Sequence, residues 1–222
     1  MGYWAYYLLW FVLAAVARYP LLALGAVLFF LLRNVLPDPF VLWRTAGRIG
    51  ALRSQIVANP ANVTARRDLA MIYIERLRPR AALKLLDEAR QRTPDDAELL
   101  FLTGVARFLS GGLEACLEPL VRAVQIDPRV GFGDPYLFAA IALGRLKRWD
   151  EAEDALERYV GLNTSSVEGY VRLHLVRIER GDRAGAKQAL REALDTWRQL
   201  PRFRKRRQLR WWWRAQLARI GL

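Results

Sequence analysis

Small and apolar residues recur at a fixed interval through the middle of the chain. Pro60, Pro94 and Pro128 are each 34 residues apart, and the residues before the last two match at several offsets. A small residue mid-way along one helix and another early in the next let two helices cross closely, and a proline ends the second helix. The pattern predicts consecutive helix pairs. The matching positions are Leu69, Ala70, Tyr73, Ala82, Leu86 and Ala89 before Pro94, and Gly104, Cys116, Leu120 and Ala123 before Pro128.

This arrangement resembles the tetratricopeptide repeat (TPR) family. The resemblance implies an all-α fold, a right-handed α-solenoid of about four TPR helix pairs that is closed by a C-terminal capping helix. The array spans residues 62–200, with units at 63–96, 97–130, 133–166 and 167–200. The third unit, after a two-residue insertion, rests on Tyr136, Ala140, Ala152 and Leu156, and the fourth on Tyr170, Leu173, Ala186, Leu190 and Ala193. Four residues depart from the family pattern: Arg107 and Arg177 replace an aromatic residue, His174 replaces a small one, and Thr164 stands at the end of the third unit in place of a proline.

Residues 1–37 form the most apolar stretch and predict a hydrophobic membrane anchor. Two apolar runs flank Arg18-Tyr19-Pro20, and neither reaches the roughly 20 residues that a spanning helix needs. Three arrangements of residues 3–36 remain open: one kinked spanning helix, an interfacial helix followed by a span, or a re-entrant hairpin. A cleaved signal peptide and a buried helical hairpin of a soluble protein are the alternatives to anchoring. Basic residues follow the segment, which predicts that the repeats lie on the cytoplasmic side, as at a bacterial inner membrane: Arg33, Arg44, Arg48 and Arg53.

A connector helix is expected between the anchor and the array, within residues 38–61. Asp38-Pro39 is a helix-start signal, with an acidic cap and a proline in the first turn. Pro60 keeps the interval of the prolines, but Arg48 stands where a repeat needs a small residue. The expected inward face of this helix consists of Leu42, Ile49, Leu52 and Ile56.

The net charge of +13 is concentrated at the two ends of the chain. Residues 63–201 hold 22 Lys or Arg and 21 Asp or Glu, so the array is nearly neutral. Residues 202–222 hold eight Lys or Arg and no acidic residue. An electrostatic partner is therefore expected at the ends rather than along the array.

The first helices of a TPR-like array line a concave groove, where protein segments usually dock. Projected onto this sequence, the inward positions are almost all apolar, which predicts an apolar helix or peptide as the partner. Alternatively, the protein's own flanks fill the groove, or these positions belong to the ordinary core. The expected groove residues are Arg67, Met71, Ile74, Phe101, Val105, Phe108, Leu137, Ile141, Val171, Leu175 and Ile178.

Residues 201–222 predict a basic, tryptophan-rich helix that caps the last repeat. Leu209, Trp213, Leu217 and Ile220 share one face at helical spacing, and this face is expected to pack inward. Three successive tryptophans cannot all face inward, because successive residues of a helix are about 100° apart. The remaining basic and aromatic residues suit an anionic lipid surface, with nucleic acid as a less favoured partner. The expected membrane-surface residues are Arg204, Lys205, Arg206, Arg207, Arg210, Trp211, Trp212 and Arg214.

The residues offer little chemistry for catalysis. The single histidine, His174, and the single cysteine, Cys116, both stand at packing positions, and no phosphate loop, HExxH pair or CxxC spacing occurs. Five carboxylates occur between Asp150 and Glu157, and most of them are expected on the solvated face of a second helix. We therefore expect a non-enzymatic scaffold or adaptor without a cofactor or a metal. A structural subunit of a membrane complex and a nucleic-acid-associated adaptor are the alternatives.

Overall fold

The structure is a computed structural model that describes residues 39–220 together with residues 7, 10, 18 and 25. Within residues 39–220 it contains ten α-helices, one short 3-10 helix and no strand. Asparagine, aspartate or serine residues cap the first helix of three of the pairs: Asn62, Asp96 and Ser166 each accept a hydrogen bond from a backbone N–H of the first turn. In chain order the elements are α3 (Pro39–Ala58), α4 (Val63–Glu75), α5 (Pro79–Arg90), α6 (Ala97–Leu109), α7 (Leu117–Ile126), η1 (Val130–Gly133), α8 (Asp134–Arg145), α9 (Trp149–Leu162), α10 (Val167–Glu179), α11 (Arg183–Gln199) and α12 (Arg202–Ile220).

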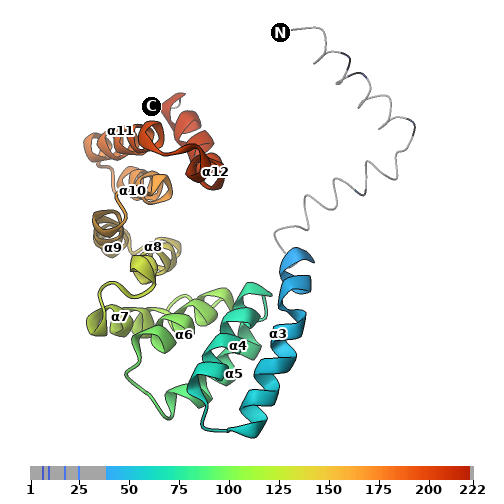
Figure 1. The fold of residues 1–222 in the computed structure, drawn as a ribbon. Helices are drawn as coiled ribbons and strands as arrows, with labels where there is room; N and C mark the ends of the chain where they lie inside the picture. The colour runs from blue at the N-terminus through green and yellow to red at the C-terminus, as the bar shows by residue number, and fades with distance from the viewer. Residues whose placement is uncertain (1–6, 8–9, 11–17, 19–24, 26–38, 221–222) are drawn as a thin grey trace.

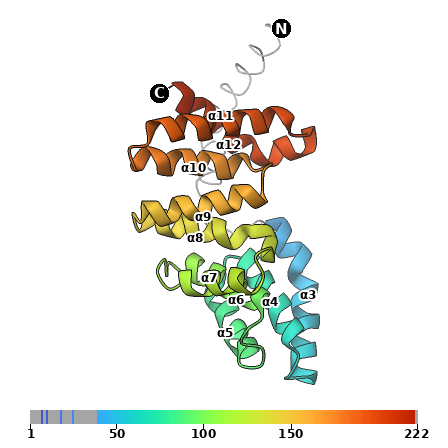
Figure 2. The ribbon, with the colours of Figure 1, turned by 90° about the vertical axis from the view of Figure 1, so that its left-hand side faces the viewer.

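The helices stack in chain order into a curved, TPR-like α-solenoid (Figure 1). Each helix packs against the next one, and α4 and α6, like α6 and α8, also touch as successive first helices. In Figure 1 the second helices α7, α9 and α11 lie on the outer side of the curve, and α8, α10 and α12 lie on the inner side. Figure 2 shows the C-terminal half edge-on as stacked layers. The four expected units each contain one helix pair, and η1 occupies the insertion before the third.

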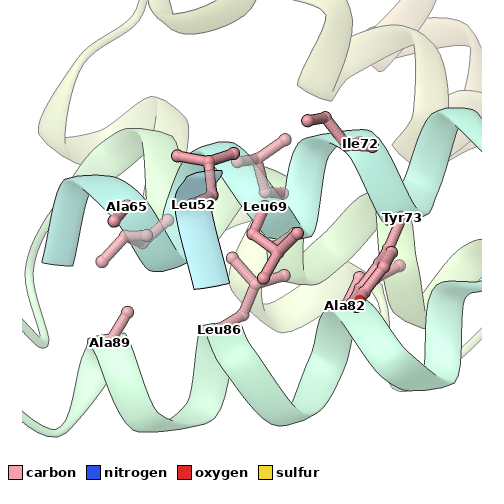
Figure 3. Close-up of a cluster of buried hydrophobic side chains, with 12 residues drawn as sticks. Leu52, Ala65, Leu69, Ile72, Tyr73, Ala82, Leu86 and Ala89 are labelled. Atoms are coloured by element: carbon pink, nitrogen blue, oxygen red, sulfur yellow. The ribbon is translucent and has the colours of Figure 1, made fainter. Parts of the chain in front are cut away.

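Small residues at the helix crossings produce the close packing that the repeat requires. In the first unit, Ala82, Leu86 and Ala89 of α5 are fully buried against Leu69 and Tyr73 of α4 (Figure 3). In the second unit, a Cβ atom added to Gly104 would lie 2.5 Å from Cγ of Leu120, so only glycine allows this approach of α6 to α7.

The connector helix α3 covers the open end of the first unit. Leu52 is buried there, and Ile49 and Ile56 pack beside it on the same cluster. Leu42, which we expected on this face, is 38% exposed. The start of α3 is held instead by polar contacts, because Arg76 donates to the Thr45 hydroxyl at 2.8 Å and to the Leu42 carbonyl at 2.6 Å.

Helix α12 caps the other end, but with a different face from the expected one. Trp211 and Ala215 are buried against α10 and α11, whereas Leu209, Trp213, Leu217 and Ile220 are 45–81% exposed. The expectation that these four residues pack inward is wrong. The start of α10 determines which face of α12 packs inward. The Gln208 side chain accepts a hydrogen bond from the Val167 N–H at 2.6 Å and donates one to the Ser165 carbonyl, so these two backbone groups at the start of α10 have hydrogen-bond partners.

The two arginines that replace aromatic residues bind neighbouring helices together. Arg107 of α6 donates to the Ala115 carbonyl and pairs with Glu118 of α7. Arg177 of α10 donates to Glu153 and Glu157 of α9 and to the Gly185 carbonyl of α11. Because a guanidinium group has several N–H donors, it can form hydrogen bonds with two elements at once. An aromatic ring at the same position would contribute packing contacts only.

No helix in residues 39–220 is long and apolar enough to cross a membrane. The membrane segment expected over residues 3–36 lies outside the described residues, apart from four isolated positions.

Candidate protein-binding groove

Two of the hollows of the solenoid are lined by helix α8, one against α7 and the other against α10. The larger, of about 780 Å³, lies between α7 on one side and α8 and α9 on the other. The smaller, of about 510 Å³, is lined by α6, α8 and α10 on the inner side, together with α9 and the cap helix α12. Apolar side chains form the bottom of both hollows. The two hollows differ in the charged residues along their edges.

The charged residues that line the larger hollow are all in ion pairs. Arg148 pairs with Glu114 at 2.8 Å and with Glu151 at 2.6 Å, and Arg158 pairs with Asp154 at 3.1 Å. Asp150 pairs with Arg180 at 2.7 Å. The charged lining residues, two arginines and three carboxylates, therefore all have ion-pair partners, and no arginine of this rim is left without a carboxylate.

The inner groove differs, because its three charged lining residues are all arginines. They are Arg145 of α8, Arg172 of α10 and Arg214 of α12, and they surround the apolar side chains of Ile141 and Leu175. Arg172 pairs with Glu168 at 2.8 Å. In the described part of the chain, Arg145 and Arg214 have no carboxylate within ion-pair distance. The groove therefore carries a net positive charge beside an apolar surface.

Aromatic rings hold these guanidinium groups in place. The Arg145 guanidinium lies 5.0 Å from the centre of the Phe108 ring, and those of Arg172 and Arg214 each lie 4.6 Å from the centre of the Trp211 ring. Stacking of arginine on an aromatic face leaves the N–H groups at the edge of the guanidinium plane available to an acceptor. The indole N–H of Trp211 is buried and has no acceptor among the described residues.

The structure brings only part of the expected groove together. Phe108, Ile141 and Leu175 line the inner groove, although Phe108 is itself largely buried. Val105, Leu137 and Val171 are buried in the core, so the expectation that they line a groove is wrong, and for them the alternative of ordinary core residues holds. Arg67 forms ion pairs with Asp68 and Glu98. The other four are half-buried or exposed elsewhere on the first helices: Met71, Ile74, Phe101 and Ile178.

The groove residues expected from the sequence did not include the three arginines Arg145, Arg172 and Arg214. Arg145 lies four residues after Ile141 and Arg172 three residues before Leu175, so both share a helix face with an expected groove residue. That spacing could have revealed them. Arg214 comes from the cap helix, and only the packing of α12 on α10 brings it to the groove.

Of the expected membrane-surface residues, Trp211 is buried and Trp212 is partly covered. Trp211 is 3% exposed, and Trp212 is half-buried and stacks on Trp197 with 5.4 Å between ring centres. Lys205 lies over the Trp197 ring, and Arg204 donates to the Ser165 hydroxyl. The outward face of α12 instead combines Trp213 with exposed leucine, isoleucine and arginine side chains: Leu209, Leu217, Ile220, Arg202, Arg206 and Arg210.

The groups with potential for chemistry are used in packing. Burial raises the pKa of the Cys116 thiol to about 11, which keeps it protonated and unreactive at neutral pH. His174 is buried, with Nδ1 2.9 Å from the Ala186 carbonyl. Of the five carboxylates of α9, four are exposed, but Glu153 is buried, contrary to the expected solvated face. No cluster of three or more potential metal ligands occurs in the residues that the structure describes.

The chain resembles known helical-repeat proteins. A family model described as "Anaphase-promoting complex, cyclosome, subunit 3" matches residues 70–159. The crystal structure of MamA protein has a TM-score of 0.63 and 23% identity, over 69% of this chain and 85% of that one. YrrB, described as a TPR protein with an unusual peptide-binding site, has a TM-score of 0.60 and 14% identity, over 75% of this chain and 81% of that one. MamA residues 41–end from Desulfovibrio magneticus RS-1 has a TM-score of 0.56 and 19% identity, over 60% of this chain and 75% of that one. No curated protein matches the sequence.

At these identities the solved structures establish the fold. The chain has a TPR-like helical-repeat fold. The expectation of a TPR-like, all-helical fold is confirmed.

Proposed function

We propose that this protein is a non-enzymatic scaffold that binds a segment of another protein in its inner groove. The proposal rests on the groove formed by α6, α8, α9, α10 and α12. This groove combines apolar side chains that contact water with two arginines, Arg145 and Arg214, that have no ion-pair partner among the described residues. A partner that covers Leu175, which is 48% exposed, would remove this apolar surface from water. The YrrB likeness supports a peptide as the kind of ligand, since that protein is described as having a peptide-binding site.

A photoreactive side chain at position 175 tests this proposal. We expect benzoylphenylalanine in place of Leu175 to cross-link the full-length protein to a discrete partner in its own cells, seen as one band of higher mass. The matched control replaces Ile126 of α7, which is exposed to a similar extent at 47% but does not line the groove. Adducts of equal yield from both positions, or none from position 175, would contradict the groove as the binding site.

We also propose that residues 3–36 anchor the scaffold to a membrane with the repeats on the cytoplasmic side. The length and apolar character of this stretch support the anchor, and the arginines that follow it support the orientation. The outward face of α12, where Trp213 and Leu209 lie among Arg202, Arg206 and Arg210, suits contact with anionic headgroups.

Extraction of membranes tests the anchor. The full-length chain is expected to stay in the membrane pellet after carbonate washing, because apolar insertion resists high pH and surface electrostatics do not. The variant that lacks residues 3–36 is expected in the supernatant at high salt, since only the basic face of α12 would then attract it to lipid. A full-length chain released by carbonate alone would exclude an inserted anchor.

A further inference from the structure

The charged residues of the inner groove identify the chemical class of its ligand. We infer that the groove binds an acidic, amphipathic segment of a partner protein, whose apolar side chains cover Ile141 and Leu175 and whose carboxylates pair with Arg145 and Arg214. This inference rests on the proposed function, because it names the ligand of the same groove.

The charge balance of the groove is the first step of the argument. Its charged lining residues are three arginines and no acid, although the repeat array as a whole is almost neutral. The carboxylate of Glu168, which does not line the groove, pairs with Arg172 at 2.8 Å and lies 4.0 Å from Arg210. A ligand without negative charge would displace water from Arg145 and Arg214 and leave both guanidinium groups without an ion-pair partner. This loss of hydration would reduce the free energy of binding.

The second step is the preorganisation of the arginines. The Phe108 ring of α6 lies beside the Arg145 guanidinium, and the Trp211 ring lies beside those of Arg172, Arg210 and Arg214, each at 4.6–5.1 Å from the ring centre. An arginine that already stacks on a ring loses less side-chain entropy when it binds a carboxylate, and its planar fork can hold both oxygens. Arg145 and Arg214 are therefore placed for binding, whereas Arg148 and Arg158 of the outer hollow are already bound to carboxylates of their own chain.

The third step is the position of the arginines relative to the apolar surface. Arg145 follows Ile141 by one helical turn, and Arg172 precedes Leu175 by slightly less than one turn. Arg214 enters from α12 on the far side of the same groove. A segment with carboxylates on the flanks of an apolar stripe would match all of these groups at once, and the cap helix would form one wall of the binding site.

The experiment compares two synthetic peptides of opposite charge. One is a fluorescent helix-forming peptide of leucine and glutamate with the leucines on one face, and the other has every glutamate replaced by lysine. Fluorescence anisotropy with the full-length protein is expected to show binding of the glutamate peptide only. Its affinity should fall by about tenfold between about 0.05 M and about 0.3 M salt, as screening weakens the contacts at the groove edge.

Neutralisation of the groove arginines provides the decisive comparison. The double variant Arg145→Gln and Arg214→Gln is expected to bind the glutamate peptide at least about tenfold more weakly. The matched control, Arg92→Gln and Arg129→Gln, removes the same charge from exposed arginines far from the groove and should bind like the unmodified chain. Equal weakening in both double variants, equal binding of the lysine peptide, or tighter binding of a single-stranded oligonucleotide than of the glutamate peptide would overturn the inference.

The outcome also separates this inference from the proposed function. If the photoreactive side chain at position 175 still captures a partner while the arginine variants bind and cross-link normally, the groove binds protein but not through acidic residues. If position 175 captures nothing, the groove itself is not the binding site and the proposed function fails.

Discussion

Glu153→Ala is expected to lower the free energy of unfolding by about 3 kcal/mol, because it leaves arginines of α10 without their buried carboxylate. Glu153 is 8% exposed and accepts hydrogen bonds from Arg177, at 2.7 Å, and from Arg180. The loss lies at the lower end of the range for a broken buried pair, since Arg177 keeps Glu157 and Arg180 keeps Asp150. Urea unfolding followed by circular dichroism measures the change.

Glu157→Ala is the matched control for this prediction. Glu157 also pairs with Arg177, at 2.6 Å, but its side chain is 53% exposed, so its loss should cost less than about 1 kcal/mol. Equal losses for the two variants would contradict the importance of burial at Glu153.

The stabilisation by Glu153 should also depend on pH. Burial by itself raises the pKa of a carboxyl group, but the hydrogen bonds from Arg177 and Arg180 outweigh burial and hold the pKa of Glu153 below its usual value of 4.5. The unfolded chain therefore binds this proton at a higher pH than the folded chain does. The stabilisation is complete above about pH 4.5 and is lost as the pH falls through the lower pKa of the folded state. The difference in stability between the unmodified chain and Glu153→Gln should shrink over that interval.

Trp211→Ala is expected to cost about 3–5 kcal/mol, the usual loss for a tryptophan removed from a core. Trp211 is 3% exposed and packs with Val171 and Leu190, so its loss opens the contact between α12 and the last helix pair. Hydrogen exchange measured by mass spectrometry should show faster exchange throughout α12 and at the start of α10, where Gln208 caps the helix.

Trp213→Ala tests the same helix at a neighbouring tryptophan. Trp213 is 56% exposed, and its removal should change stability by less than about 1 kcal/mol. A larger loss at Trp213 than at Trp211 would restore the inward face expected from the sequence and contradict the packing described here. Trp211→Phe separates the contribution of the ring from that of the indole N–H, which has no acceptor in the described residues.

Helix α12 connects three features of the molecule. Its inward face, centred on Trp211, closes the solenoid, and Arg214 extends from it into the inner groove. Its outward face carries Trp213 and the exposed arginines. Deletion of the helix would therefore disturb stability, partner binding and lipid contact together, whereas point variants at Trp211, Arg214 and Trp213 examine each one separately.

The repeat pattern of the sequence was sufficient to predict the local structure. Small residues such as Ala82 and Gly104 and the evenly spaced prolines are needed wherever two helices cross closely, whatever lies around them. The buried positions of the second helices followed from the same spacing. The packing of α3 through Leu52 and Ile56 was also predictable, because those residues share one helix face.

The groove and the cap helix depended on contacts between residues far apart in the chain. On α12, Leu209 and Trp213 form a good apolar face, but Trp211 and Gln208 fit the start of α10, and this complementarity outweighs hydrophobic spacing. The sequence gives no sign that Glu153 differs from the neighbouring solvated carboxylates. Its burial depends on its ion pairs with Arg177 and Arg180, which lie more than 20 residues away in the chain.

The sequence by itself thus determined the helices, their pairing and the neutral charge of the array, because these depend on residues within about one repeat of each other. Only the tertiary structure decided which arginines lack partners and which face of the last helix is buried. Both depend on how successive layers pack across the solenoid, and in particular on the approach of Arg214 and Trp211 to α10.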